Sequence, residues 1–138
     1  MNPDLAARAG IDALIARFFR AFDNRAGTPA IEDVTGCFAD KAVIACHDGA
    51  GTKLYTALEF AAPRIALLEG GSLRDFSEAE TESTTAVVGG IATRTSRYAK
   101  SGFLGGAPYG GCGTKLFHLV LVEGRWLISS LAWQDDLP

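Results

Sequence analysis

The first part of the chain has the hydrophobic periodicity of an amphipathic helix. From residue 11 to residue 22, apolar side chains recur every three or four positions, with charged residues between them. This spacing places the apolar side chains on one helix face. Asn2 followed by Pro3 is a favourable helix start, and Asn24 and Gly27 are favourable stops. The buried face of this predicted helix consists of Ile11, Leu14, Ile15, Phe18, Phe19 and Phe22.

Two shorter helices are predicted downstream of the first. The second begins at Thr28 and Pro29, a capping residue followed by one suited to the first helical turn. The third begins at Thr56, whose hydroxyl forms a capping box with the Glu59 carboxylate. Pro63 lies inside this third helix and lacks a backbone donor, so we expect a kink or a break there.

The remaining segments favour β-strands. A short strand is expected over residues 42–46, followed by a loop over residues 47–51. After the third helix we expect four strands near residues 73–82, 86–100, 114–123 and 125–135. Turns are expected at residues 83–85 and 123–124. Consecutive strands joined in this way form an antiparallel meander, and helices followed by strands indicate a single α+β domain over residues 1–138.

The connection between the second and third of these four strands is rich in glycine. Residues 102–113 include six glycines but lack the spacing and the strand-to-helix context of a phosphate-binding loop. We therefore expect a mobile hairpin tip. Two roles stay open for it, a lid over a pocket or an arm across a dimer.

Composition and charge exclude several functions. The chain has 138 residues and a net charge of −3, and its basic residues form no run, so no nucleic-acid partner is expected. No secretory signal and no apolar stretch of membrane-spanning length are present, so we expect a cytoplasmic protein without a membrane partner. Three cysteines without a CxxC pair predict neither a disulfide framework nor a zinc site. No metal or cofactor is expected.

Both faces of the strand over residues 116–122 are apolar. Leu116, Val120 and Val122 point to one side of it, and residues 117, 119 and 121 point to the other. The sheet of a monomer usually exposes one polar face to water. We therefore expect the helices to cover one face and a second copy of the chain to cover the other, giving a homodimer.

Six stretches of the chain resemble the nuclear-transport-factor-2-like (SnoaL-like) superfamily, in particular a bacterial branch of unassigned function. These stretches are residues 38–44, 62–68, 75–80, 98–102, 111–115 and 124–136. The resemblance implies a cone in which three N-terminal helices pack on a curved, mainly four-stranded antiparallel sheet and enclose an apolar pocket. That superfamily includes isomerases, dehydratases, polyketide cyclases and non-catalytic binders, so fold alone does not name the function.

Three residues are candidate acid–base groups. Asp135 shares a strand face with Trp133, and burial beside that ring would raise its pKa; alternatively the two form a core tryptophan and a solvated acidic tail. His118 alternates with apolar neighbours, which suits either a pocket acid–base or a core or interface residue. His47 beside Asp48 suits either a base or a turn.

The steroid-isomerase branch of the superfamily carries its carboxylate base on the first strand. The corresponding positions here are Ala45 and Cys46. That branch also has a tyrosine on the first helix, where this chain has phenylalanines. Steroid-isomerase chemistry is therefore not expected.

The remaining candidates are pocket-lining side chains. Tyr55 and Tyr98 are candidate hydrogen-bond donors to an oxyanion, with amphipathic packing as the alternative. Arg64 and Glu80 are expected to pair across the pocket mouth or as a structural ion pair. The predicted pocket lining is Phe19, Phe22, Tyr55, Arg64, Tyr98 and Trp133.

Three functions stay open at this point. The first is a dimeric protein with an apolar pocket for a small apolar or carbonyl-containing molecule, without assigned catalysis. The second is a cofactor-free isomerase, dehydratase or cyclase that uses His118, Asp135 or His47 for proton transfer. The third is a protein-interaction module that uses the open sheet face.

Overall fold

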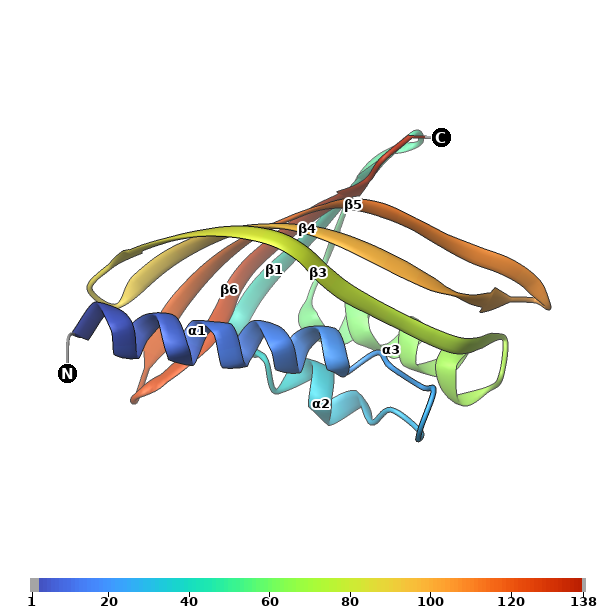
Figure 1. Ribbon diagram of the computed structural model, residues 1–138, viewed down its shortest axis with the longest axis horizontal. Coiled ribbons are helices and arrows are strands. Elements are labelled where there is room, and N and C mark those ends of the chain that lie inside the picture. The colour runs from blue at the N-terminus through green and yellow to red at the C-terminus, as the bar shows by residue number, and fades with distance from the viewer. Residues whose placement is uncertain (1–2, 138) are drawn as a thin grey trace.

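The computed structural model describes residues 3–137 and shows three helices beneath one curved sheet (Figure 1). The helices are α1 (Pro3–Arg20), α2 (Ile31–Thr35) and α3 (Ala57–Glu69). The strands are β1 (Phe38–Asp48), β2 (Gly51–Tyr55), β3 (Leu73–Val88), β4 (Ile91–Leu104), β5 (Ala107–Val122) and β6 (Arg125–Asp135). The helices lie on the concave side of the sheet, as expected for an α+β fold.

The sheet has six strands in the order β2-β1-β6-β5-β4-β3 and is mixed, which corrects the expected four-stranded antiparallel sheet. The strands β3 to β6 form the antiparallel meander that was predicted. The first strand then pairs in parallel with the last, with Ile44 beside Leu131. Residues 47–51, expected as a loop, instead continue β1 and enter β2 through a hairpin that pairs His47 with Thr52. The parallel pairing of β1 with β6 joins segments that are far apart in sequence, so no local pattern signals it.

The hairpins of the meander are longer than expected. Residues 83–85 lie within β3, opposite residues 94–96 of β4, and the β3–β4 turn falls at Gly89 and Gly90. The expected turn at Glu123 and Gly124 is present, and both residues have positive φ angles, 49° and 79°. This geometry fits a tight hairpin turn.

The glycine-rich segment forms a hairpin tip, as predicted, but most of it is paired strand rather than an unpaired connection. Within residues 102–113, β4 and β5 stay paired up to Leu104 and Ala107. The chain reverses at Gly105 and Gly106, whose φ angles are 61° and 85°. A Cβ atom at Gly110 would lie 2.7 Å from the Lys100 carbonyl oxygen. Some of these glycines therefore permit close strand approach and a tight reversal, neither of which composition distinguishes from a flexible loop.

The first helix packs its predicted apolar face against the sheet. It ends at Arg20, before the expected stop at Asn24; the expected cap, Asn2, lies outside the described residues. Asn24 instead joins the helix exit to β3. Its amide nitrogen donates to the Leu73 carbonyl oxygen (2.8 Å), and its carbonyl oxygen accepts from the Phe76 amide (2.7 Å).

The two short helices match the predictions unequally. The second starts at Ile31 after an Ala30 N-cap rather than at Thr28 and Pro29. The third starts with the predicted capping box: the Glu59 amide donates to the Thr56 hydroxyl (3.1 Å), and the Thr56 amide donates to the Glu59 carboxylate (2.9 Å). Pro63 does not break α3, which runs as one helix to Glu69.

An aromatic cluster joins the helices to the sheet. Phe18 is fully buried, and its ring centroid lies between 5.4 and 6.4 Å from five other ring centroids. Four of the five pairs meet edge to face, the arrangement that aromatic quadrupoles favour. The five neighbours are Phe19, Phe22, Phe38, Phe60 and Phe117.

The opposite face of the sheet has no helix on it. In β5, Phe117 and Leu119 are buried toward the helices, whereas Leu116 and His118, which alternate with them along the strand, are exposed. A bulge between His118 and Leu119 shifts the pairing with β6. Leu121, expected on the side of Phe117, is 45% exposed. The other large apolar residues of the sheet that are exposed are Val43, Leu54, Val88, Ile91, Phe103, Leu104 and Val122.

The capping box should contribute measurably to stability. We expect Thr56→Ala to lower the free energy of unfolding by about 1 kcal/mol, because the Glu59 amide loses its side-chain acceptor. Thr56→Ser keeps the hydroxyl and should unfold like the wild type. Urea unfolding of the three proteins, followed by circular dichroism, measures the difference, and equal midpoints for all three would exclude a stabilising cap.

Candidate functional site

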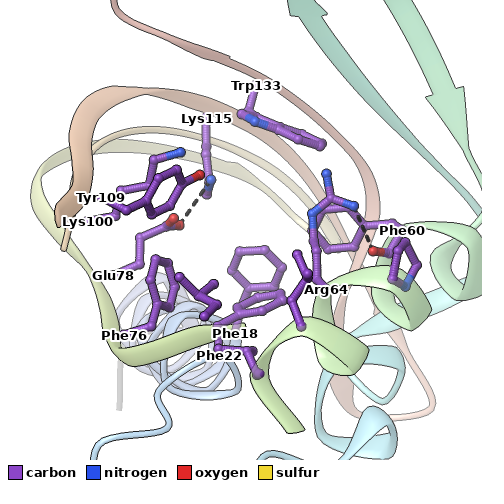
Figure 2. Close-up of a pocket in the computed structure, with 14 residues that line it drawn as sticks. Phe18, Phe22, Phe60, Arg64, Phe76, Glu78, Lys100, Tyr109, Lys115 and Trp133 are labelled. Atoms are coloured by element: carbon purple, nitrogen blue, oxygen red, sulfur yellow. Dashed lines mark hydrogen bonds and ion pairs between the residues drawn. The ribbon is translucent and has the colours of Figure 1, made fainter. Parts of the chain in front are cut away.

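A cavity of about 340 Å³ lies between the helices and the concave face of the sheet (Figure 2). Pockets of ligand-binding size start near this volume. Its wall is mainly aromatic and aliphatic, with four charged residues. The lining residues are Phe18, Phe22, Phe60, Pro63, Arg64, Leu67, Leu68, Leu73, Phe76, Glu78, Lys100, Tyr109, Lys115 and Trp133.

The aromatic wall is assembled from five elements. Helix α1 supplies Phe18 and Phe22, and α3 supplies Phe60. The sheet supplies Phe76 from β3, Tyr109 from β5 and Trp133 from β6. Trp133 contacts Phe60 edge to face, with ring centroids 5.3 Å apart. These rings give the cavity flat apolar surfaces on opposing sides.

Lys115 places a buried amine inside this aromatic wall. Its Nζ lies 3.1 Å from an oxygen of Glu78, and both side chains are at most 10% exposed. The same nitrogen lies 3.9 Å from the centroid of the Tyr98 ring. Burial lowers the pKa of Lys115 because a charged amine is poorly solvated there, while Glu78 partly compensates. The amine therefore lies inside the cavity wall with a carboxylate beside it.

A second ion pair lies at the sheet end of the cavity. Lys100 Nζ lies 2.9 Å from one Asp135 oxygen, and the Tyr98 hydroxyl donates to the other. Burial opposes ionisation of Asp135, but the hydrogen bonds from Tyr98 and Lys100 outweigh it and lower the pKa of Asp135. Burial and the neighbouring carboxylate raise the pKa of Tyr98. Asp135 is thus an anion, and Tyr98 is a neutral donor, at ordinary pH.

Gly113 makes the contact between Tyr98 and Asp135 possible. In the sheet it lies between them, paired with Tyr98 on one side and with Asp135 on the other. A Cβ atom at this position would overlap the Tyr98 hydroxyl and lie 2.6 Å from the Gln134 carbonyl oxygen. Glycine therefore leaves the space through which the tyrosine reaches the next strand.

Arg64 is the third cation of the cavity. Its guanidinium lies over three aromatic rings, 4.4 Å from the Phe60 centroid, 5.1 Å from Trp133 and 5.6 Å from Tyr55. One nitrogen donates to the Phe60 carbonyl oxygen at 2.8 Å. In residues 3–137, no carboxylate lies within salt-bridge distance of it.

The expected pair between Arg64 and Glu80 is wrong. Glu80 binds Arg94 at 2.5 Å and accepts a hydrogen bond from Ser96. Arg94 also pairs with Asp12 of α1 at 2.6 Å. The sheet register pairs Glu80 with Tyr98 of β4, and its carboxylate reaches Arg94 of the same strand. Pairing with a neighbouring strand therefore prevails over pairing with a distant helix.

Most of the predicted pocket residues lie in or beside the cavity. Phe22, Arg64 and Trp133 line it directly. Tyr55 stacks on Trp133, with ring centroids 6.4 Å apart. Tyr98 lies behind Lys115, and the remaining predicted residue, Phe19, lies in the core next to Phe18.

The two histidines do not reach the cavity. His118 is exposed on the helix-free face of β5, where its Nδ1 lies 3.0 Å from the Ser130 hydroxyl. His47 is exposed near the β1–β2 turn, with its Nδ1 2.8 Å from the Thr52 hydroxyl. Neither histidine candidate for proton transfer therefore lines this cavity, and His47 instead borders a separate pocket with Asp135 at the β1–β2 turn. The period-two alternation of a strand assigns His118 to the opposite face from Phe117.

Sequence reasoning found Arg64 but missed the other three charged residues that line the cavity. Lys115 alternates with the apolar Phe117 and Leu119, so its inward orientation was visible in the strand pattern. Lys100 and Glu78 carried no such signal, because bulges in the β3–β4 pairing shift their register. Their positions became visible only when the strands were paired.

No known protein family and no curated protein matches this sequence. Solved structures match it closely in fold. A nuclear-transport-factor-2-like superfamily protein from Salmonella enterica serovar Typhimurium has a TM-score of 0.78 at 11% identity, over 98% of this chain and 94% of the other. An NTF2-like protein of unknown function from Pseudomonas putida gives 0.72 at 16% identity, over 97% and 89%.

A third solved structure extends the comparison. A protein of unknown function with a cystatin-like fold from Nostoc punctiforme gives a TM-score of 0.69 at 15% identity, over 94% of this chain and 90% of the other. The chain is therefore of the class in which helices cover the concave face of a curved sheet. Within that class its fold is the nuclear-transport-factor-2-like fold, as the resemblance implied. At these identities the likeness establishes the fold and no activity.

Residues 3–137 contain neither a membrane-spanning helix nor a cluster of metal-ligating side chains. No helix in this range has the length and apolar character needed to cross a membrane. No cluster of three or more His, Cys, Asp or Glu side chains there has the proximity needed to ligate a metal ion.

The buried pair should respond to mutation as a unit. We expect Lys115→Met to lower the free energy of unfolding by about 3 kcal/mol, because it leaves Glu78 buried without its cation. Adding Glu78→Gln to Lys115→Met should recover most of that loss. Chemical denaturation of both variants tests this, with Lys53→Met as the control for losing an exposed lysine. A double variant that is no more stable than the single one would show that the two groups are not coupled.

Proposed function

We propose that this protein is a small-molecule binding protein whose cavity holds one small, largely apolar molecule. One observation carries the proposal: a cavity of about 340 Å³ combines opposing aromatic walls with a small number of inward-facing charged groups. Concave sites of this composition bind ligands, because the rings supply contact area and the polar groups fix orientation.

The polar groups support a molecule with a carbonyl or an anionic end. Lys115 and Lys100 each lie in the lining with a carboxylate partner, and Arg64 lies there without one. These donors are set in an otherwise mainly apolar lining. A ligand would bury its ring system against Phe22 and Phe76 and direct its polar end toward the cations.

Catalysis is not part of the proposal. Both histidine candidates are exposed outside the cavity. The third candidate, Asp135, has a lowered pKa because Lys100 and Tyr98 bind its carboxylate. As an anion it holds the side chains of Lys100 and Tyr98 in place. Binding requires only the cavity and its donors.

A neutral fluorescent probe tests the binding proposal. We expect N-phenyl-1-naphthylamine to gain fluorescence on binding the wild type. Leu67→Trp adds bulk at the lining of the cavity and should weaken binding by about tenfold, through lost contact area. Leu58→Trp makes the same change on an exposed position of the same helix, outside the lining, and should leave the titration unchanged.

Two outcomes would contradict the binding proposal. The first is the absence of saturable probe binding by the wild type. The second is equal affinity in the wild type and both tryptophan variants, which would place the probe outside the cavity.

We infer a homodimer formed through the helix-free face of the sheet. Leu116 and Val43 are 52% and 50% exposed on this face, and Ile91 at its edge is 59% exposed. The neighbours of Leu116 on the adjacent strands are small and uncharged, Thr95 on β4 and Ala132 on β6. A face that is apolar and poor in charge is self-complementary about a two-fold axis, so a second copy of the chain suits it.

Sedimentation velocity at micromolar concentration tests the dimer. We expect the wild type to sediment as a dimer and Leu116→Glu to sediment as a monomer, because the interface would bury an unpaired carboxylate. Leu58→Glu on the helical side is the matched control and should remain dimeric. A monomeric wild type, or a dimeric Leu116→Glu protein, would exclude this interface.

A further inference from the structure

Arg64 differs from the other two cations of the cavity in having no carboxylate partner. Lys115 is paired with Glu78 at 3.1 Å, and Lys100 with Asp135 at 2.9 Å. The charges of these two pairs cancel. Arg64 therefore leaves the cavity one positive charge in excess.

The surroundings of Arg64 hold its guanidinium ready to bind an anion. The group lies over the rings of Phe60, Trp133 and Tyr55, and one nitrogen donates to the backbone of its own helix. These contacts fix the plane of the group while leaving further N–H donors available. A guanidinium is charged at all ordinary pH values, and its planar donors match the two oxygens of a carboxylate.

Arg64 and Lys115 border the same part of the cavity. Their charged ends lie 5.1 and 5.6 Å from the centroid of the Trp133 ring, and Figure 2 shows them on either side of the space next to it. A group bound at Arg64 therefore lies beside an aromatic surface and near a second donor. The rest of the space is bounded by Phe18, Phe22 and Phe76.

We propose that the cavity selects a small aromatic monocarboxylate, with the carboxylate bound to Arg64 and the ring system between Trp133 and the phenylalanines of α1 and β3. This inference rests on the proposed binding function and specifies its ligand class. One negative charge matches the one uncompensated cation, whereas a dianionic phosphate would leave one charge unpaired in an apolar space. The aromatic part follows from the walls, which are flat and face each other across the cavity.

A pair of ligands that differ only in charge tests the selection. We expect 1-naphthoate to bind the wild type at least about tenfold more tightly than its neutral isostere 1-naphthamide at pH 7, as charge-assisted hydrogen bonds imply. Isothermal titration calorimetry measures both. Arg64→Gln should bring the two affinities together by weakening 1-naphthoate far more than 1-naphthamide. Arg64→Lys keeps the charge without the planar donors of a guanidinium. Its preference for 1-naphthoate over 1-naphthamide should lie between those of the wild type and Arg64→Gln.

Two controls make the result interpretable. Arg125→Gln removes an exposed arginine at the far end of β6 and should leave the preference for 1-naphthoate unchanged. N-phenyl-1-naphthylamine is neutral, so saturable binding of this probe by Arg64→Gln, with a smaller loss of affinity than that of 1-naphthoate, shows that the cavity persists in that variant.

The outcomes separate this inference from the proposed function. Equal binding of 1-naphthoate and 1-naphthamide by the wild type would overturn the carboxylate selection while leaving the binding function intact. A charge preference that survives in Arg64→Gln, with probe binding retained, would overturn the role of Arg64. Failure of all three compounds to bind the wild type would overturn the binding function itself.

Discussion

The packing of Phe18 is the contact on which the rest of this structure depends. Its ring meets rings from its own helix, from α3, and from the first and fifth strands. These contacts hold the helices against the concave face of the sheet. The same side chain borders the cavity, so the core and the candidate site share a wall. A change that loosens Phe18 should therefore disturb both.

The charged groups of the cavity lie in an enclosed and mainly apolar space, where ion pairing offsets the cost of burying them. A buried lysine or carboxylate is costly unless it has a partner. Lys115 has Glu78, and Lys100 has Asp135 with Tyr98 beside it. Arg64 has aromatic faces and a carbonyl but no countercharge. An anionic ligand would complete a pattern that the other two cations already show, which is why we propose ligand binding rather than proton transfer.

Local sequence signals predicted features that depend on neighbouring residues. The capping box at Thr56 and Glu59, the tight turn at Glu123 and Gly124, and the helical face around Phe18 were all correct, because each is set by residues a few positions apart. The errors came where a local signal had two physical causes. Glycines in residues 102–113 suggested a flexible tip, yet they serve close strand approach and a tight reversal. Pro63 suggested a break, yet α3 is continuous.

By itself, the sequence determined the three helices, the four strands of the antiparallel meander and the superfamily resemblance, because periodicity and turn chemistry are local. It also indicated Arg64, Phe22 and Trp133 as pocket residues. Only the tertiary structure decided that β1 pairs in parallel with β6, that His118 faces away from the cavity, and that Lys115 meets Glu78 inside it. These depend on strand register and on the side of the sheet that the helices cover. A shift of one residue in register reverses every side chain of a strand, so the site exists only once all strands are paired.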